Sequence, residues 1–199
     1  MLEQLLPEVF ERSHLINNRQ RRLDLVKAMA ESDKAGFSCA NCIGNCCTFS
    51  SNSMRITPLE AVEILSFLEN EERISIELMK NLDRVVSEYR LETETYFGIK
   101  KNYTCPFYLG HRKGCSISRW SKPYGCLAFN STKLNVTKGE DCRSDQVSLQ
   151  KRNARFYRHE EDLNSYIKRI LKLSWNKESI PVALLDILKK GELCPPQDI

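Results

Sequence analysis

Apolar and polar residues alternate with a helical period over much of the chain. One such stretch covers about residues 8–34, where apolar residues recur every three or four positions with charged residues between them. A second begins in the segment RITPLEAVEILSFLENEE. There Thr57 is a good N-cap, Pro58 suits the first helical position, and Glu60 completes a capping box. Both stretches are therefore predicted to be helices.

Further stretches extend the helical pattern. Residues 75–96 and 144–173 carry apolar residues at helical spacing, and a shorter helix is predicted over residues 181–190, with Gly191 as its stop signal. Residues 98–142 differ, because they hold several glycines, two prolines and four cysteines. We expect turns and irregular loops there. The chain is thus predicted to be mainly α, a helical scaffold that holds two cysteine-bearing irregular loops.

The chain of 199 residues fits a single domain. Its hydrophobic content of 41% and charged content of 28% are typical of a globular protein with a substantial core. The sequence divides into an N-terminal helical segment at 1–36, a cysteine-cluster domain at 37–143 and a C-terminal helical segment at 144–199. We expect these three segments to pack together as one compact unit.

No apolar run approaches the roughly 20 residues that a membrane-spanning helix needs, so no membrane partner is expected. The N-terminal stretch MLEQLLPEVFERSHL lacks the basic and apolar regions of a secretory signal. We therefore expect a cytoplasmic protein. Reducing cytosol keeps ordinary thiols unpaired, and nine cysteines are an odd number that a complete disulfide framework would not give.

The segment FSCANCIGNCC at residues 37–47 contains four cysteines, and four more lie in the glycine-containing loop region. A cytoplasmic chain uses so dense a cluster for metal binding or redox chemistry more often than for disulfides. The predicted metal ligands are Cys39, Cys42, Cys46, Cys47, Cys105, Cys115, Cys126 and Cys142.

The spacing within the first group carries most of the signal. Cys39 and Cys42 form a Cys-x2-Cys turn, which lets two sulfurs converge on one ion. Cys46 and Cys47 are adjacent, and neighbouring residues usually point their side chains apart. They would therefore serve two separate metals, or a cluster and a redox thiol. Cys194, in the C-terminal tail, is predicted to play no part.

Together these motifs resemble a bacterial family that is described as a zinc- or iron-chelating domain and is named for its CxxCxxCC motif. The resemblance covers about residues 39–129 in three blocks: the first cysteine group, the helix start RITPLEAVEIL, and the segment CPFYLGHRKGCSISRWSKPYGCLAF. The first block is one residue longer here, and Lys122 and Leu127 stand where the family usually has arginine. The resemblance implies metal binding through the cysteines and no particular reaction.

The flagellin lysine methylases carry a similar cysteine cluster, associated with an iron–sulfur centre, and the chain is distantly similar to them. It has no glycine-rich methyl-donor loop. Three functions stay open: a metal-binding protein whose centre is its function, a structural zinc module for protein or RNA interaction, and an iron–sulfur-dependent protein methylase. The expected cofactor is an iron–sulfur cluster, such as [4Fe-4S], or zinc. We favour the iron–sulfur cluster over zinc because such a cluster tolerates irregular spacing of its ligands.

Trp120 and Tyr124 flank Cys126 and are predicted to pack over the site and exclude water. Basic residues near the cysteine blocks either offset thiolate charge or face water. These are Arg55, Arg112, Lys113, Arg119 and Lys122.

Two basic runs, RQRR at residues 19–22 and QKRNARFYRH at residues 150–159, suggest either an RNA-binding face or, as we expect, solvated helix faces. The net charge of +4 counts every thiol as neutral. It would fall to about zero if eight thiolates held two divalent ions. Nucleic acid is therefore not expected as a partner, and the remaining expectation is a protein partner or substrate that the sequence does not identify.

Overall fold

The structure is a computed structural model that describes residues 1–13, 16–35, 44–92, 101–110, 114–131 and 142–193. It is mainly α-helical, as the sequence predicted, with short strands. Within the described ranges, no helix combines the length and the apolar character needed to cross a membrane. The elements in chain order are α1 (Leu2–Leu5), α2 (Pro7–Ser13), α3 (Asn18–Lys34), the 3-10 turn η1 (Asn45–Cys47), β1 (Arg55–Ile56), α4 (Pro58–Asn70), α5 (Ile76–Glu88), α6 (Tyr124–Leu127), β2 (Phe129–Ser131), β3 (Cys142–Ser144), α7 (Gln146–Ile170), β4 (Glu178–Ser179) and α8 (Ile180–Lys190).

The chain forms two compact units, each assembled from segments that are far apart in the sequence. Unit 1 comprises Met1–Ile16, Arg55–Lys101 and Arg158–Ile199, and unit 2 comprises Asn17–Met54 and Asn102–Tyr157. The units therefore interleave along the chain, whereas the three segments expected from the sequence follow chain order. Every described cysteine belongs to unit 2.

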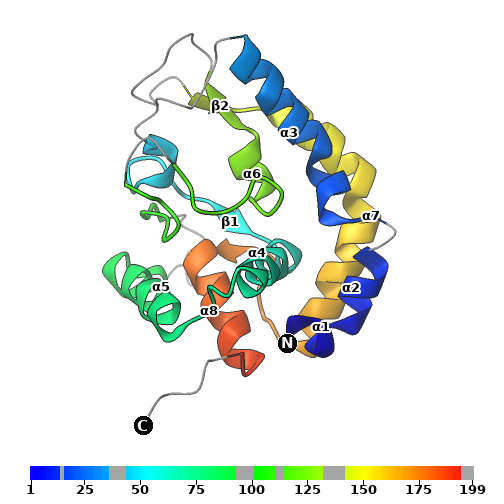
Figure 1. Cartoon of the computed structure of the whole chain (residues 1–199), viewed down its shortest axis with the longest axis vertical. Coiled ribbons are helices and arrows are strands. Elements are labelled where there is room, and N and C mark those ends of the chain that lie inside the picture. Colours follow the sequence, from blue (N-terminus) through cyan, green and yellow to red (C-terminus); the bar gives the residue numbers. More distant parts are fainter. Residues whose placement is uncertain (14–15, 36–43, 93–100, 111–113, 132–141, 194–199) are drawn as a thin grey trace. The chain divides into compact units, whose positions relative to one another are not determined.

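In unit 1, helices α4 and α5 each pack against α8 (Figure 1). Helix α4 begins at the predicted capping box, which is confirmed. The Thr57 hydroxyl accepts a hydrogen bond from Glu60 N at 3.3 Å, and the Glu60 carboxylate accepts one from Thr57 N at 2.9 Å. Fully buried apolar residues of this core include Ile56, Leu59, Ile64, Leu65, Leu68, Leu82, Leu184 and Leu188.

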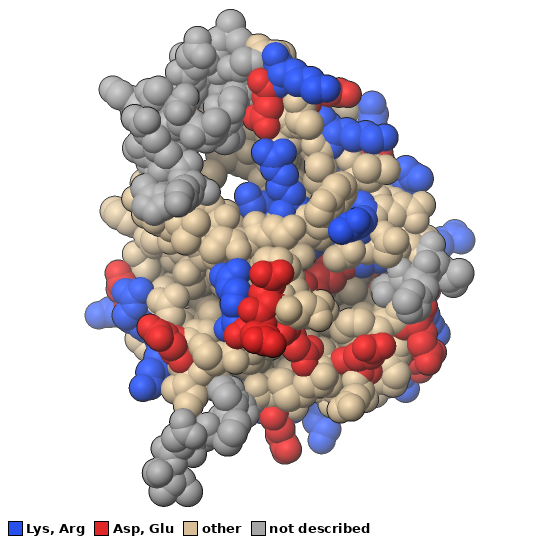
Figure 2. All heavy atoms as spheres, in the orientation of Figure 1, with Lys and Arg blue, Asp and Glu red and all other residues tan. Residues whose placement is uncertain are grey.

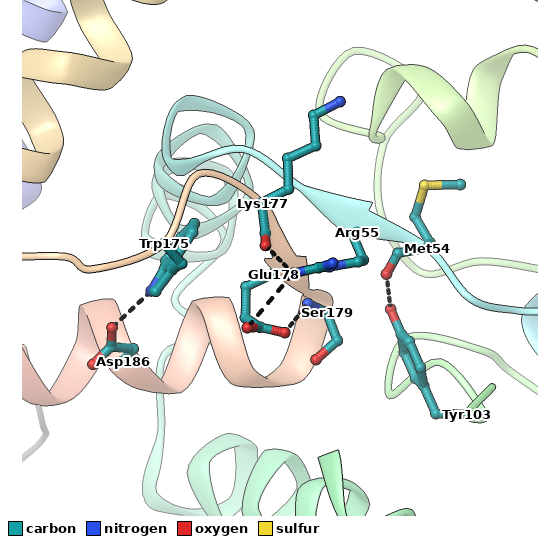
Figure 3. Close-up of polar contacts among 8 residues, drawn as sticks. All are labelled: Met54, Arg55, Tyr103, Trp175, Lys177, Glu178, Ser179 and Asp186. Atoms are coloured by element: carbon teal, nitrogen blue, oxygen red, sulfur yellow. Dashed lines mark hydrogen bonds and ion pairs between the residues drawn. The ribbon is translucent and has the colours of Figure 1, made fainter. Parts of the chain in front are cut away.

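Strands β1 and β4 pair antiparallel and join the segments that precede α4 and α8. The Arg55 guanidinium donates a hydrogen bond to the Lys177 carbonyl at 2.5 Å and lies 4.0 Å from the buried Glu178 carboxylate (Figure 3). Glu178 Oε1 also accepts a hydrogen bond from Ser179 N at 2.7 Å. These contacts account for Arg55, which the sequence had offered as a neighbour of the cysteines.

In unit 2, helix α3 lies beside the first half of α7 (Figure 1), and the two are joined by hydrogen bonds from Arg152 to Arg21 and from Arg155 to Asp24. The core of this unit packs α3 against the short helix α6. Strands β2 and β3 pair antiparallel next to α6, in the register Phe129 to Ser144. The core residues are Leu25, Tyr124, Leu127 and Ala128, with Val26, Met29 and Leu149 packed against them.

Two predicted helices have different bounds in the structure. The stretch predicted as one helix over 8–34 contains α2, which ends at Ser13, and α3, for which Asn17 is the N-cap. The Asn17 side chain accepts a hydrogen bond from Gln20 N at 2.9 Å, which favours a new start there. The helix predicted to reach residue 96 ends at Glu88, where Tyr89 is the C-cap and Arg90 has a positive φ of 51°.

Candidate metal centre

Of the first cysteine group, the structure describes only the second half, Cys46 and Cys47. The predicted ligands Cys39 and Cys42 lie outside the described residues. Cys46 and Cys47 lie on η1, a single 3-10 turn that closes when Cys47 N donates a hydrogen bond to Gly44 O at 2.7 Å. Both thiols are half-buried.

Gly44 brings this turn against the second cysteine-bearing loop. Its φ is +78°, and a Cβ atom there would lie only 2.3 Å from Cε2 of Tyr108. Glycine is therefore required both by the backbone conformation and by the closeness of the ring. The main chains of the two loops are joined as well, because Cys105 N donates a hydrogen bond to Cys47 O at 2.7 Å.

A tight loop brings Cys105 and Cys115 close together. Tyr108 N donates to Cys105 O at 3.0 Å, and Tyr108 then pairs with Cys115 as an isolated antiparallel bridge. Leu109 N donates to Gly114 O at 2.9 Å, so the described residues before and after 111–113 are also joined. Two cysteines ten residues apart are thus held near one another by main-chain hydrogen bonds.

Cys126 comes from a third segment, the four-residue helix α6 that follows Pro123. Its neighbour Gly125 lies so close to Met54 that an added Cβ would be 2.8 Å from the Met54 sulfur. Helix α6 therefore packs directly on the chain segment that leaves the first cysteine loop. The sequence marked Cys126 as a ligand but predicted no helix there, because four residues carry no periodic signal.

The thiols from these segments interact electrostatically. Burial raises the pKa of the Cys105 thiol to about 12, and neighbouring cysteines add to the shift. Burial likewise raises the pKa of Cys126, with Cys105 and Cys115 as further causes. A hydrogen bond with Cys47, followed by burial, raises the pKa of Cys46. We define the thiol cluster as Cys46, Cys105, Cys115 and Cys126, since Cys46 and Cys115 each contribute to the shifts at Cys105 and Cys126.

Lys122 is the cation of the thiol cluster. The positive charge of its ammonium group opposes the rise in pKa at Cys46, Cys105 and Cys126 alike. A main-chain donor also reaches the cluster, because Ile117 N hydrogen-bonds the sulfur of Cys115 at 3.4 Å.

The other candidate charges lie elsewhere or are not described. Arg119 forms an ion pair with Asp33 at 3.3 Å, on a partly exposed surface. Arg112 and Lys113 lie outside the described residues. Of the basic residues singled out in the sequence, Lys122 is therefore the one whose surroundings link it to the described thiols.

No disulfide joins any two of the six described cysteines. Cys142 is the most enclosed of them, 6% exposed, on the β3 strand that pairs with β2 beside α6. Among the described residues, which lack Cys39 and Cys42, no three side chains of Cys, His, Asp or Glu are placed to hold one metal ion as they stand. The thiol cluster thus brings sulfurs into one neighbourhood, without a finished coordination shell in the described part of the chain.

The expectation that both basic runs are solvated helix faces is wrong for three of their arginines. Arg21, Arg22 and Arg152 are buried, at 1%, 0% and 3% exposure. Helical spacing gave a signal for this, because Arg21 and Arg152 each stand four residues before a buried apolar residue, Leu25 and Phe156.

These runs therefore meet each other inside unit 2. On the face drawn in Figure 2, some of the described basic side chains lie beside acidic ones. Arg155, on the exposed side of α7, is itself paired with Asp24 at 3.2 Å. Much of the positive charge that suggested RNA binding is thus engaged within the protein.

Comparison with family models, with curated proteins and with solved structures finds no match to this chain. The resemblance to the zinc- or iron-chelating cysteine-cluster family stays a prediction based on the three motif blocks. What the site does is therefore argued from the placement of its own residues.

Proposed function

We propose that this protein binds an inorganic centre through cysteine thiolates, with the thiol cluster as the core of the ligand set. The observation that carries the proposal is that three separate cysteine-bearing segments are joined: Cys105 N donates a hydrogen bond to Cys47 O, and the turn that carries Cys126 packs on Met54, with no disulfide among the described cysteines. The other predicted ligands, Cys39, Cys42, Cys47 and Cys142, remain candidates for completing the site. We further propose that the protein is cytoplasmic, where such thiols stay reduced.

The donor set fits a thiophilic metal. Soft thiolate ligands select zinc and iron–sulfur clusters over hard cations such as calcium or magnesium. Burial and mutual repulsion disfavour the thiolate form of Cys105 and Cys126 in the absence of a cation. A bound metal supplies the positive charge that these thiolates need, and Lys122 contributes a further positive charge nearby.

An iron–sulfur cluster is the first candidate for the centre and zinc is the second. The cluster would supply one-electron transfer, whereas zinc would hold the loops of unit 2 in place without redox chemistry. In either case the thiols must lose their protons to solvent as the metal binds, so that acid opposes binding.

Single cysteine variants test the ligand assignment. Cys105→Ser and Cys126→Ser should each lose most of the bound metal, because a serine hydroxyl is a poor ligand for these metals. Elemental analysis and the visible spectrum of anaerobically purified protein measure the loss. The control is Cys194→Ser, which removes a thiol from the C-terminal tail and should keep the metal content of the unmodified chain. Full metal content in both Cys105→Ser and Cys126→Ser would overturn the assignment.

A further inference from the structure

We propose that arginines buried around Tyr124 act as a clamp that positions Cys126 for metal binding. The clamp consists of Arg21, Arg22 and Arg152, which come from α3 and α7. This inference rests on the proposed function, because it assigns residues that hold one ligand of the same centre. None of the three arginines was marked in the sequence as part of the site.

The ring of Tyr124 is held by all three arginines. The Cζ atom of Arg152 lies 3.3 Å from the ring centroid, and that of Arg22 lies 4.6 Å from it. Arg21 Nε donates a hydrogen bond to the Tyr124 hydroxyl at 3.3 Å. Desolvated cation–π contacts of this kind are stronger than those at exposed sites. Tyr124 itself is 7% exposed, so its ring has little room for another position.

The arginines are in turn fixed to the scaffold. Arg152 Nε donates a hydrogen bond to the carbonyl of Arg21 at 3.2 Å, which joins α7 to α3. Arg22 Nε donates to the carbonyl of Lys122 at 2.8 Å. The clamp therefore holds both the side chain of Tyr124 and the main chain two residues before it.

Helix α6 depends on such support because it is too short to be stable alone. It has four residues, and its N-cap Pro123 makes no side-chain capping hydrogen bond. A single helical turn does not repay the entropy of its own nucleation, so tertiary contacts decide where it lies. Cys126 is on this turn, two residues after the clamped ring, and Lys122 is just before it.

The consequence is that the clamp positions one cysteine of the thiol cluster and the neighbouring Lys122 at once. It holds the turn that carries Cys126 against Met54, on the segment that follows the first cysteine loop, and it holds the main chain of Lys122. Residues that hydrogen-bond a metal ligand directly typically contribute 10- to 100-fold to metal affinity, and this range sets the scale for a clamp that acts through the main chain.

The test compares two arginines on the same helix. Arg152→Met removes the guanidinium that stacks on Tyr124, whereas the matched control Arg155→Met removes an exposed arginine paired with Asp24. The whole chain is freed of metal anaerobically and titrated with Co²⁺, whose thiolate charge-transfer bands report ligand number. We expect Arg152→Met to bind Co²⁺ about 10- to 100-fold more weakly, with weaker bands, and Arg155→Met to match the unmodified chain. Equal binding by the two variants would overturn the clamp.

A second comparison guards against a general loss of folding. Arg152→Lys keeps a buried cation and should recover part of the Co²⁺ affinity, whereas a purely space-filling role predicts no recovery over methionine. Alkylation of metal-free protein, mapped by mass spectrometry, should label Cys126 faster in Arg152→Met than in Arg155→Met. Equal labelling rates would again count against the clamp. If the unmodified chain bound no thiophilic metal, the proposed function would be overturned instead. The clamp would then be tested only by the labelling rates of Cys126 in Arg152→Met and Arg155→Met.

Discussion

Gly44 shows how a single residue sets the approach of two cysteine loops. Its positive φ and the Tyr108 ring 2.3 Å from the position of a Cβ atom impose two separate requirements. Gly110 meets the first requirement only, since its φ is +72° and an added Cβ would meet nothing within 4 Å. The two glycines therefore allow the backbone effect to be separated from the contact effect.

We predict that Gly44→Ala destabilises the protein more than Gly110→Ala. Both variants place a side chain in the left-handed region, which costs roughly 1–2 kcal/mol. Gly44→Ala must also displace the Tyr108 ring, at a further cost of about 1–3 kcal/mol. Urea unfolding of the metal-free proteins measures the difference. Equal losses in the two variants would contradict the close packing of η1 on Tyr108.

At the scale of elements, the start of α7 depends on a charged cap. Asp145 precedes the helix, and its carboxylate accepts hydrogen bonds from the Ser148 hydroxyl at 2.6 Å and from Ser148 N at 2.9 Å. These two bonds, the hydroxyl first, lower the pKa of Asp145 below its ordinary value. Asp145 N also donates to Ala128 O at 2.8 Å, so the cap connects α7 to the segment after α6.

We predict that Asp145→Ala lowers the free energy of unfolding by about 1 kcal/mol, as loss of an N-cap does. Because folding lowers the pKa of this carboxyl, its contribution is present above the ordinary value near 3.8 and is lost as the pH falls through the folded value. Urea unfolding should therefore show a smaller difference in unfolding free energy between the unmodified chain and Asp145→Ala at pH 3 than at pH 7. Ser148→Ala keeps the main-chain hydrogen bond but loses the hydroxyl, so it should weaken this acid dependence. A difference that is the same at both pH values would contradict the cap.

Helices with explicit start and stop signals could be predicted from the sequence. The Thr57 capping box gives the start of α4, and Gly191 is the C-cap of α8 as expected. The break before Asn18 was missed because the apolar period continues across it. The end of α5 was missed for the same reason, and α6 and the short strands have too few residues for any period.

The candidate site was predictable in its residue types and only partly in its arrangement. Spacing singled out the cysteines, but the segments that carry Cys46, Cys105 and Cys126 are joined by tertiary contacts that no local pattern encodes. The buried arginines were misjudged because charge was taken as a sign of exposure. A guanidinium is buried here because it stacks on an aromatic ring and donates to main-chain carbonyls.

At the scale of the whole molecule, the thiol cluster depends on segments from both ends of the cysteine region. Unit 2 takes α3 and the first half of α7 as well as the loops. A fragment of residues 37–143 would contain all eight predicted ligands but neither of these helices. It would therefore lack both the clamp and the core residue Leu25, against which α6 packs.

We predict that the 37–143 fragment neither folds nor holds metal with the affinity of the whole chain. Circular dichroism should show little helix, and Co²⁺ titration should give weaker binding without saturated thiolate bands. The fragment and the whole chain should be compared at equal thiol concentration under anaerobic conditions. Equal affinity for Co²⁺ would mean that the loops assemble the centre without α3 and α7.

The most direct measurement is the content of iron, acid-labile sulfide and zinc in the full chain purified without oxygen, together with its visible spectrum. We expect near-stoichiometric metal: iron with sulfide and a brown thiolate-to-iron absorption, or zinc in a colourless protein. Titration of thiols in the same sample should find the cluster cysteines protected until the metal is removed. A protein free of iron and zinc, with all nine cysteines reactive or joined in disulfides, would contradict a thiolate-bound centre.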